Sequence, residues 1–240
     1  VTVEWPMENF QKYKVLLTEN NNFRKLFAAR LITLGGDWLL TVPLLGIIYE
    51  LTENPFITSL VLVVQSAPLF MLGSFGGYLA DRFDRKKIIA ISEFLSGLTV
   101  LLILYAVTTE SVVFILFSFG LLSVAGSPYM PTSDAALLNV VKKENLAEAN
   151  VIFFSSWGVM AGLGAGLGGF LTTIISRNML FAIDSLSFVL SALIVFSINK
   201  NLSEKSENKN EEDISYKEGL KYAASKKEIF QLHRFDWKFT

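Results

Sequence analysis

The sequence of 240 residues has no cysteine and one histidine, His233. Within these residues, that excludes disulfide frameworks, thiolate zinc sites, cysteine nucleophiles and histidine-dependent triads. Charged residues are also scarce, at 18% of the chain against roughly 25% in an average soluble domain. The 21 basic and 22 acidic residues leave a net charge of −1, which gives no indication of a nucleic-acid partner.

Hydrophobic residues make up 52% of the chain and are gathered into six long runs. A helix needs about 20 residues to cross a hydrocarbon core, and each run is long enough. The runs lack the regular polar face of a soluble helix. Because lipid offers the backbone no hydrogen bonds, each run is predicted to be helical, which makes this an all-α membrane protein. The runs cover residues 26–49, 57–80, 88–109, 111–141, 151–176 and 179–199.

Lysine and arginine indicate the orientation of these helices. They gather in every second connection and in both terminal segments, whereas the alternate connections hold only Arg177. Basic residues concentrate on the cytoplasmic side of membrane proteins. We therefore expect a multi-pass protein of the cell (plasma) membrane with both termini in the cytoplasm. Its parts are an amino-terminal arm, 1–25, a six-helix bundle, 26–199, and a tail, 200–240.

Two stretches of the chain resemble each other. Gly76-Gly77-Tyr78-Leu79 closes the second apolar run, and Gly168-Gly169-Phe170-Leu171 lies in the fifth; the run after each begins with a similar segment that contains one acid. The second run goes inward and the fifth outward, so the two copies of a three-helix repeat have opposite topology. Such 3+3 inverted repeats build secondary transporters. Chance similarity between short apolar segments is the alternative.

Charged residues inside the bilayer are candidates for function, because each costs roughly 2.5 to 3.5 kcal/mol to insert. Asp37, near mid-membrane, is our leading candidate for a proton-coupling or cation-coupling group. Arg30 lies two turns earlier on the same face, so a water-bridged structural pair between the two is the alternative. Glu93, Asp134 and Asp184 lie nearer the ends of their runs, where capping and snorkelling favour structural roles.

Further polar residues in the runs are expected to line a substrate path. Gln65 is a candidate for the cavity wall, and the prolines of the fourth run, Pro128 and Pro131, are expected to kink it. The proton-coupling or substrate-path residues are therefore predicted to be Asp37, Arg30, Gln65 and Glu93. Nothing in the sequence indicates a catalytic residue, a bound cofactor or a metal ligand set.

The connection after the second run contains a compact motif. A glycine here lets two helices approach closely, an aspartate offers a carboxylate to helix-end amides or a basic partner, and the basic residues hold the loop at the cytoplasmic surface. A plain positively charged anchor is the alternative. The predicted gating residues are Gly77, Asp81, Arg82, Arg85, Lys86 and Lys87.

The fifth run is rich in glycine. Small residues at a spacing of four let a neighbouring helix pack closely, and the predicted packing glycines are Gly162, Gly164, Gly168 and Gly169. The segment formally fits G-x-G-x-x-G, but it lies inside a lipid-length helix and not after a strand, which argues against dinucleotide binding.

The connection 77–87 resembles the signature between helices 2 and 3 of the major facilitator superfamily, with Asp84 in place of a second glycine. The glycine-rich run resembles the helix 5 motif of that family's exporters. Together with Gly35-Gly36-Asp37-Trp38 and the segment 183–188, these motifs resemble the macrolide-efflux and enterobactin-exporter branch. The resemblance implies one half of a twelve-helix fold and proton-coupled export of drugs or siderophore-like amphiphiles. It also implies a cytoplasmic gate whose charge contacts break as the bundles rock.

The chain ends after six apolar runs, and the charged segment 231–240 does not read as the start of a seventh. We expect an amino-terminal half, truncated before helix 7, whose start is either Val1 or Met7. Its partners would be the lipid bilayer, a small amphiphilic substrate, protons, and a carboxy-terminal half or a second copy. An inactive or regulatory membrane fragment is one alternative. A six-helix subunit of an ATP-driven exporter is another; it would need a separate ATPase because the chain has no P-loop.

Overall fold

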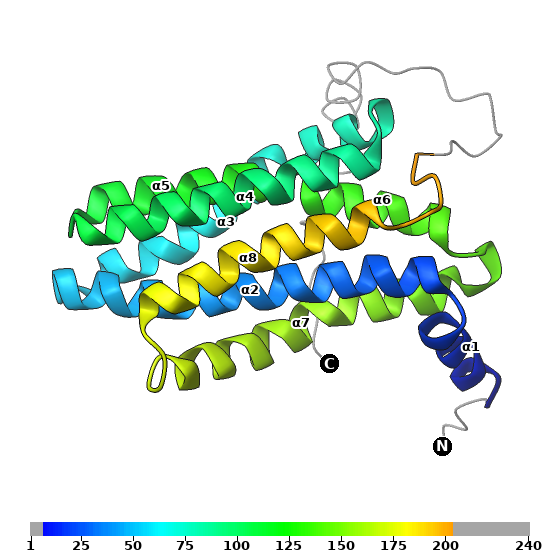
Figure 1. Ribbon diagram of the computed structural model, residues 1–240, viewed down its shortest axis with the longest axis horizontal. Helices are drawn as coiled ribbons and strands as arrows, with labels where there is room; N and C mark the ends of the chain where they lie inside the picture. The colour runs from blue at the N-terminus through cyan, green and yellow to red at the C-terminus, as the bar shows by residue number, and fades with distance from the viewer. Residues whose placement is uncertain (1–6, 204–240) are drawn as a thin grey trace, which may run out of the picture. The chain divides into compact units, whose positions relative to one another are not determined.

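The computed structural model describes residues 7–203, and within that range every regular element is a helix (Figure 1). Residues 1–6 and 204–240, which include the alternative start at Val1 and most of the predicted tail, lie outside the described residues. The elements are α1 Met7–Thr18, α2 Asn21–Thr52, α3 Pro55–Arg82, α4 Arg85–Thr108, α5 Val112–Gly126, α6 Tyr129–Val140, the 3₁₀ helix η1 Lys143–Asn145, α7 Leu146–Leu171 and α8 Arg177–Phe196.

Six helical segments are long and apolar enough to cross a membrane, which confirms the predicted fold class. They are α2, α3, α4, α5 with α6, η1 with α7, and α8. Polar caps mark where several of them begin: Asn20 accepts a hydrogen bond from the Phe23 amide at 3.0 Å, and Asn54, Ser111 and Ser176 cap α3, α5 and α8.

The fourth span is broken near its middle. Helix α5 ends at Gly126 and α6 begins at Tyr129, with Pro128 at the junction, where the sequence predicted a kink. Proline lacks the amide hydrogen that would continue the ladder of backbone hydrogen bonds. The break leaves a surface that another helix can approach closely: a Cβ added at Gly76 of α3 would lie 2.7 Å from Pro131 Cγ and 3.0 Å from Pro128 Cα.

The packing follows the predicted repeat. Gly76 of the second span packs against the fourth span, and Gly168, its counterpart in the fifth span, packs against the first, where a Cβ added to it would lie 3.0 Å from the Trp38 carbonyl oxygen. The third and sixth spans, α4 and α8, pack along each other, and α2 packs against both α7 and α8 (Figure 1). Exchanging the first three spans with the last three would give the same set of contacts.

Two apolar clusters hold the bundle together at different levels. One contains Phe23, Ile89, Val140, Phe153 and Val195. The other contains Leu44, Val61, Ile103, Ile115 and Phe181. On α2 and α4, buried polar side chains lie between the positions that contribute to the two clusters. On α8, Asp184 and Ser185 lie among positions of the second cluster, and Ser191 lies between the two clusters, so the bundle has a polar layer partway along its length.

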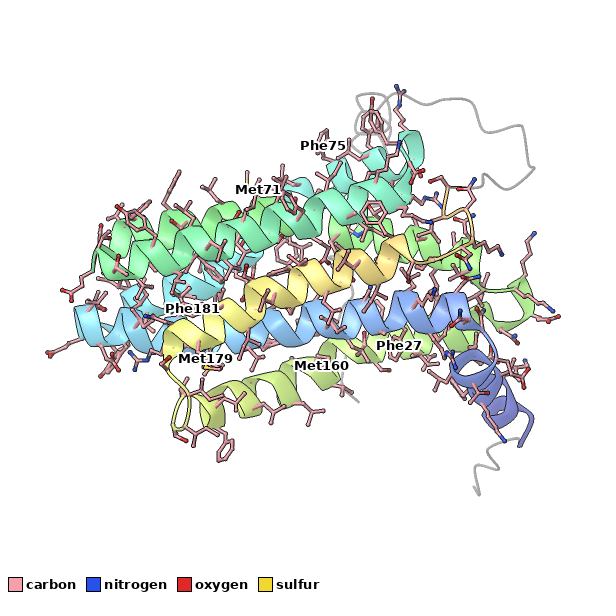
Figure 2. The ribbon with its side chains drawn as sticks, viewed as in Figure 1. Phe27, Met71, Phe75, Met160, Met179 and Phe181 are labelled. Atoms are coloured by element: carbon pink, nitrogen blue, oxygen red, sulfur yellow. The ribbon has the colours of Figure 1, made fainter. Side chains whose placement is uncertain are left out.

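The outer face of the bundle is apolar. Phe70 of α3 and Phe154 of α7 are 84% and 87% exposed. In Figure 2, Met71 and Phe75 project away from the neighbouring helices, whereas the fully buried Phe181 lies among them. An exposed apolar surface of this extent is expected where lipid or another helix covers the protein.

Candidate functional site

A cavity of about 210 Å³ opens among the membrane helices at the level of the polar layer. Asp37, Gln65 and Glu93 line it, so the structure brings together three of the four residues predicted for the substrate path. Its aromatic wall is Trp38, Phe119, Tyr129, Trp157 and Phe188, and its hydroxyl groups come from Thr33, Ser66, Ser92, Ser96, Ser123 and Ser127. The cavity therefore offers aromatic faces and hydrogen-bonding groups together, which suits an amphiphilic molecule.

Arg30 is the predicted path residue that does not line the cavity. Its guanidinium is 3% exposed and lies 2.8 Å from the Asp134 carboxylate of α6. It also donates to Ser156 Oγ of α7 at 3.2 Å and lies 4.7 Å above the Phe153 ring. Arg30 thus pairs with Asp134. The alternative interpretation of the spacing, a pair between Arg30 and Asp37, is wrong. Residues far apart in the sequence supply the partner, so the helical period of α2 alone could not indicate it.

Glu93 lies well inside α4 and is only 1% exposed. The Thr33 hydroxyl of α2 donates to Glu93 Oε1 at 2.8 Å and lies 3.0 Å from the Ser191 hydroxyl of α8. Glu93 Oε2 is buried without a hydrogen-bond partner. The expected role of Glu93 near a helix end, with capping or snorkelling, is therefore wrong: the side chain points into the bundle and reaches the cavity.

Asp184 is also fully buried, contrary to the expectation of a position that snorkels or caps. Ser187 donates to its Oδ1 at 3.3 Å, and its Oδ2 has no hydrogen-bond partner. The carboxyl occupies the space beside Gly36 of α2, where an added Cβ would collide with Asp184 Oδ1. Asp184 interacts electrostatically with Asp37, as does Glu93, so acids from α2, α4 and α8 share one region of the polar layer.

The connection between α3 and α4 is built around Arg85. Its side chain donates to the Ala80 carbonyl at 3.0 Å, to the Ala135 carbonyl at 3.0 Å and to Asn139 Oδ1 at 2.6 Å. It also reaches the Leu202 carbonyl at 3.2 Å, beyond the end of α8. One guanidinium therefore joins the ends of α3, α6 and α8, because its fixed fork of donors suits several carbonyl oxygens at once.

The other predicted loop residues have distinct surroundings. Asp81 lies 3.9 Å from Arg85, Arg82 stacks 4.8 Å from the Tyr78 ring, and Lys86 donates to the Ile198 carbonyl. Asp84 accepts from the Lys87 amide at 3.1 Å and caps α4 with an ordinary φ of −63°. This turn therefore does not need the glycine that stands here in the family signature, because an N-cap aspartate makes it.

Some of the glycines at which another helix packs closely differ from the predicted ones. Gly164 contacts Trp38, with the added Cβ 2.7 Å from Trp38 Cβ, and Gly168 contacts the same segment of α2. A Cβ added at Gly162 or Gly169 would meet nothing within 4 Å. Gly77 likewise faces open space, and the close approach expected there is made by its neighbour Gly76.

The hydroxyls that complete the polar layer were not among the residues predicted from the sequence. Thr33 and Ser191 are buried, at 5% and 0% exposure, and hold Glu93 between α2 and α8. In the sequence they stand out only as polar residues inside otherwise apolar runs. This signal is weak, because hydroxyls are common in membrane helices and often bond to their own backbone. Within residues 7–203, no group of three or more acidic, histidine or cysteine side chains could hold a metal ion.

Several known proteins resemble this chain in sequence. Residues 26–238 match the family model of the Major Facilitator Superfamily. An uncharacterized MFS-type transporter, YfiS, of Bacillus subtilis is 29% identical over 87% of this chain and 51% of its own length. A Na(+), Li(+), K(+)/H(+) antiporter of Planococcus maritimus is 24% identical over 71% of the chain and 41% of its own length. The enterobactin exporter EntS of Shigella boydii is 28% identical over 65% of the chain and 38% of its own length.

A solved structure shares the fold. The crystal structure of the peptide transporter POT with alafosfalin superposes with a TM-score of 0.59 at 17% identity, covering 74% of this chain and 38% of the transporter. The chain spans about half the length of the curated relatives it matches. These relatives are transporters, not enzymes. With six candidate membrane helices and a family match over residues 26–238, the chain belongs to the Major Facilitator Superfamily.

Proposed function

We propose that this chain forms the amino-terminal half of a secondary active transporter that exports small amphiphilic molecules in exchange for protons. The observation that carries the proposal is the cavity in the polar layer, where the carboxyl groups of Asp37 and Glu93 stand among aromatic rings and serine hydroxyls. A carboxyl that faces a substrate cavity can bind a proton in one conformation and release it in another. The relatives named as an antiporter and an enterobactin exporter support both the coupling and the direction of transport.

Asp37 is our choice for the group that exchanges protons with the cavity. It lines the cavity, and no cation of the described residues forms an ion pair with it. Arg30, the nearby cation of α2, is taken up by Asp134. A carboxyl that is not neutralised by a fixed cation keeps the freedom to bind and release a proton.

The loop 81–87 is proposed to lie on the cytoplasmic side and to gate it, with both termini on the same side. The contacts of Arg85 with α6 and with the segment after α8 tie the loop to its own bundle. Asp81, whose side chain is 76% exposed, is then free to contact a second bundle. Breaking such a contact as the bundles rock would open the cytoplasmic side of the cavity.

A second bundle is proposed to cover α3 and α7, supplied by a carboxy-terminal half or by another copy of this chain. In the apolar 18-residue stretch of α3 only 6% of the residues are buried, and in that of η1 with α7 only 22% are buried. The glycines that face open space, Gly77 in α3 and Gly162 and Gly169 in α7, would admit a closely packed helix. A cavity closed by two bundles could enclose a substrate that one bundle exposes.

The test is transport in vesicles. The purified chain, alone and co-reconstituted with the carboxy-terminal half of a close relative, is incorporated into liposomes, and efflux of a fluorescent amphiphilic dye is followed with and without a pH gradient. Gradient-dependent efflux that disappears in Asp37→Asn supports the proposal. The matched control is Glu144→Gln, which removes the same charge from a side chain of η1 that is 70% exposed. Folded protein that moves no dye in either arrangement would favour the inactive or regulatory fragment.

A further inference from the structure

Asp184 is the most deeply buried acid of the polar layer and has no role in the function proposed above. It lies in the first half of α8, is 0% exposed and does not line the cavity. It reaches α2 at Gly36, the residue directly before Asp37, where the missing side chain leaves room for its carboxyl. The acid therefore packs against α2 one residue before Asp37 and outside the lining of the cavity.

Its hydrogen bonding is incomplete. Asp184 Oδ1 accepts one bond, from Ser187 Oγ at 3.3 Å, and that hydroxyl also donates to the Asp184 carbonyl oxygen at 2.8 Å. Oδ2 is buried without a partner. An ionised carboxylate in such a place would have one weak donor in place of its shell of water. A neutral carboxyl can place its proton on the unpartnered oxygen and needs no further donor.

The charges around Asp184 give it no cation. The charged groups that act on it electrostatically are Asp37 of α2 and Glu93 of α4, both of them acids. Tyr129 of α6 interacts with Glu93 and with Arg30 of α2 in the same layer, but Arg30 is bonded to Asp134. Among the described residues, no lysine or arginine forms an ion pair with Asp184. A carboxylate kept for structure alone is usually paired, so this arrangement indicates another use.

We infer that Asp184 is a second proton-binding site of the chain, an inner carboxyl that exchanges its proton with the cavity through Asp37. In this exchange an O–H bond of Asp37 breaks and one on Asp184 Oδ2 forms, so the proton changes place and no other reactant is consumed. We take the ligand to be a proton and not a sodium ion, because no group of three or more acidic, histidine or cysteine side chains among the described residues could hold a metal ion. The inference deepens the proposed proton coupling and rests on it for its use in transport.

The test reads the carboxyl directly and does not depend on transport. Infrared difference spectra of the full chain in lipid are recorded between alkaline and acidic pH, and the C=O stretching band of protonated carboxyls is followed. We expect Asp184→Asn to remove one component of this band. Ser187→Ala should shift the same component, because it removes the hydroxyl that the carboxyl oxygen Oδ1 shares with the Asp184 carbonyl oxygen. Glu144→Gln, at the exposed pair with Lys142, should leave that component in place.

The outcomes separate this inference from the proposed function. If the band is unchanged in Asp184→Asn while the protein remains monodisperse and helical, the inference is wrong even if Asp37-dependent export is found. If Asp184→Asn does not fold, the Ser187→Ala shift decides the matter, and no shift overturns the inference. Loss of the band on adding sodium at constant pH would also overturn it, in favour of a sodium site. If the band behaves as expected but wild-type efflux ignores the pH gradient, the inner proton site stands and the proposed coupling fails.

Discussion

The Arg30 guanidinium of α2 lies 2.8 Å from the Asp134 carboxylate of α6, and the two ends of this pair differ in exposure, at 3% and 57% of their side chains. Arg30 also bonds to Ser156 and stacks on Phe153, both in α7. A single buried cation therefore fixes three helices from both repeats to one another. The exposed partner lies where solvent or a second bundle can reach it.

Asp134→Asn should destabilise the bundle, because it leaves the Arg30 charge buried without its counterion. Breaking a fully buried pair costs about 3–5 kcal/mol, and the exposure of Asp134 reduces this to about 1–3 kcal/mol. Reversible denaturation in mixed micelles measures the change. The double variant Arg30→Met with Asp134→Asn should recover part of the loss. An unchanged midpoint in the single variant would show that the pair contributes nothing.

Adjacent glycines provide a matched pair of substitutions. Gly76→Ala should destabilise the protein by about 1–3 kcal/mol, because the new Cβ meets the rigid Pro128 and Pro131. Gly77→Ala has nothing within 4 Å and should be neutral or stabilise α3 by up to about 1 kcal/mol through helix propensity. Thermal unfolding of the two variants side by side checks the order. The reverse order would contradict the packing described here.

The same comparison applies in α7. Gly168→Ala would bring a Cβ to 3.0 Å from the Trp38 carbonyl oxygen, whereas Gly169→Ala meets nothing within 4 Å. We expect only the first to lower the unfolding temperature of the chain. If Gly169→Ala alone weakens association with a second bundle, measured by crosslinking in lipid, its open face is a docking surface. Equal effects of the two variants on stability would argue against the asymmetry between these glycines.

Arg85→Lys should loosen the cytoplasmic ends of the helices while keeping the charge. Lysine cannot reach the Ala80, Ala135 and Leu202 carbonyls together, so the local opening free energy should fall by about 1.5–3 kcal/mol. Hydrogen exchange of residues 198–203 and of the end of α6 is the measurement. The control is Lys87→Arg, at an exposed position of the same loop. Protection that is unchanged in Arg85→Lys would remove the assigned role of the guanidinium.

Thr33→Val should destabilise the polar layer, because it keeps the shape of the side chain and removes the donor to Glu93 Oε1. Leaving a buried carboxyl oxygen without a partner costs about 1–3 kcal/mol. Thr99→Val, whose exposed hydroxyl bonds only to the Leu95 carbonyl of its own helix, should change stability little. Denaturation of both variants under one condition gives the comparison, and similar losses would contradict the special position of Thr33.

The sequence was a good guide wherever the lipid environment imposes a rule on each segment separately. The six membrane helices, the break at Pro128 and the repeat follow from run length, proline chemistry and internal similarity, none of which needs a partner helix. It was a poor guide for individual contacts. Gly76 and Gly77 look alike in the sequence, and only the position of α5 and α6 makes one of them a contact and leaves the other open.

By itself, then, the sequence determined that this chain is a bundle of six membrane helices in two related units, because hydrocarbon forces every apolar run of sufficient length to satisfy its own backbone. Only the tertiary structure decided which charges meet. It placed Arg30 against Asp134, Thr33 against Glu93, and Asp184 behind Gly36. The physical reason is that a polar group in lipid takes whichever partner the packed helices bring within reach, and that partner is set by the rotation and depth of helices distant in the chain.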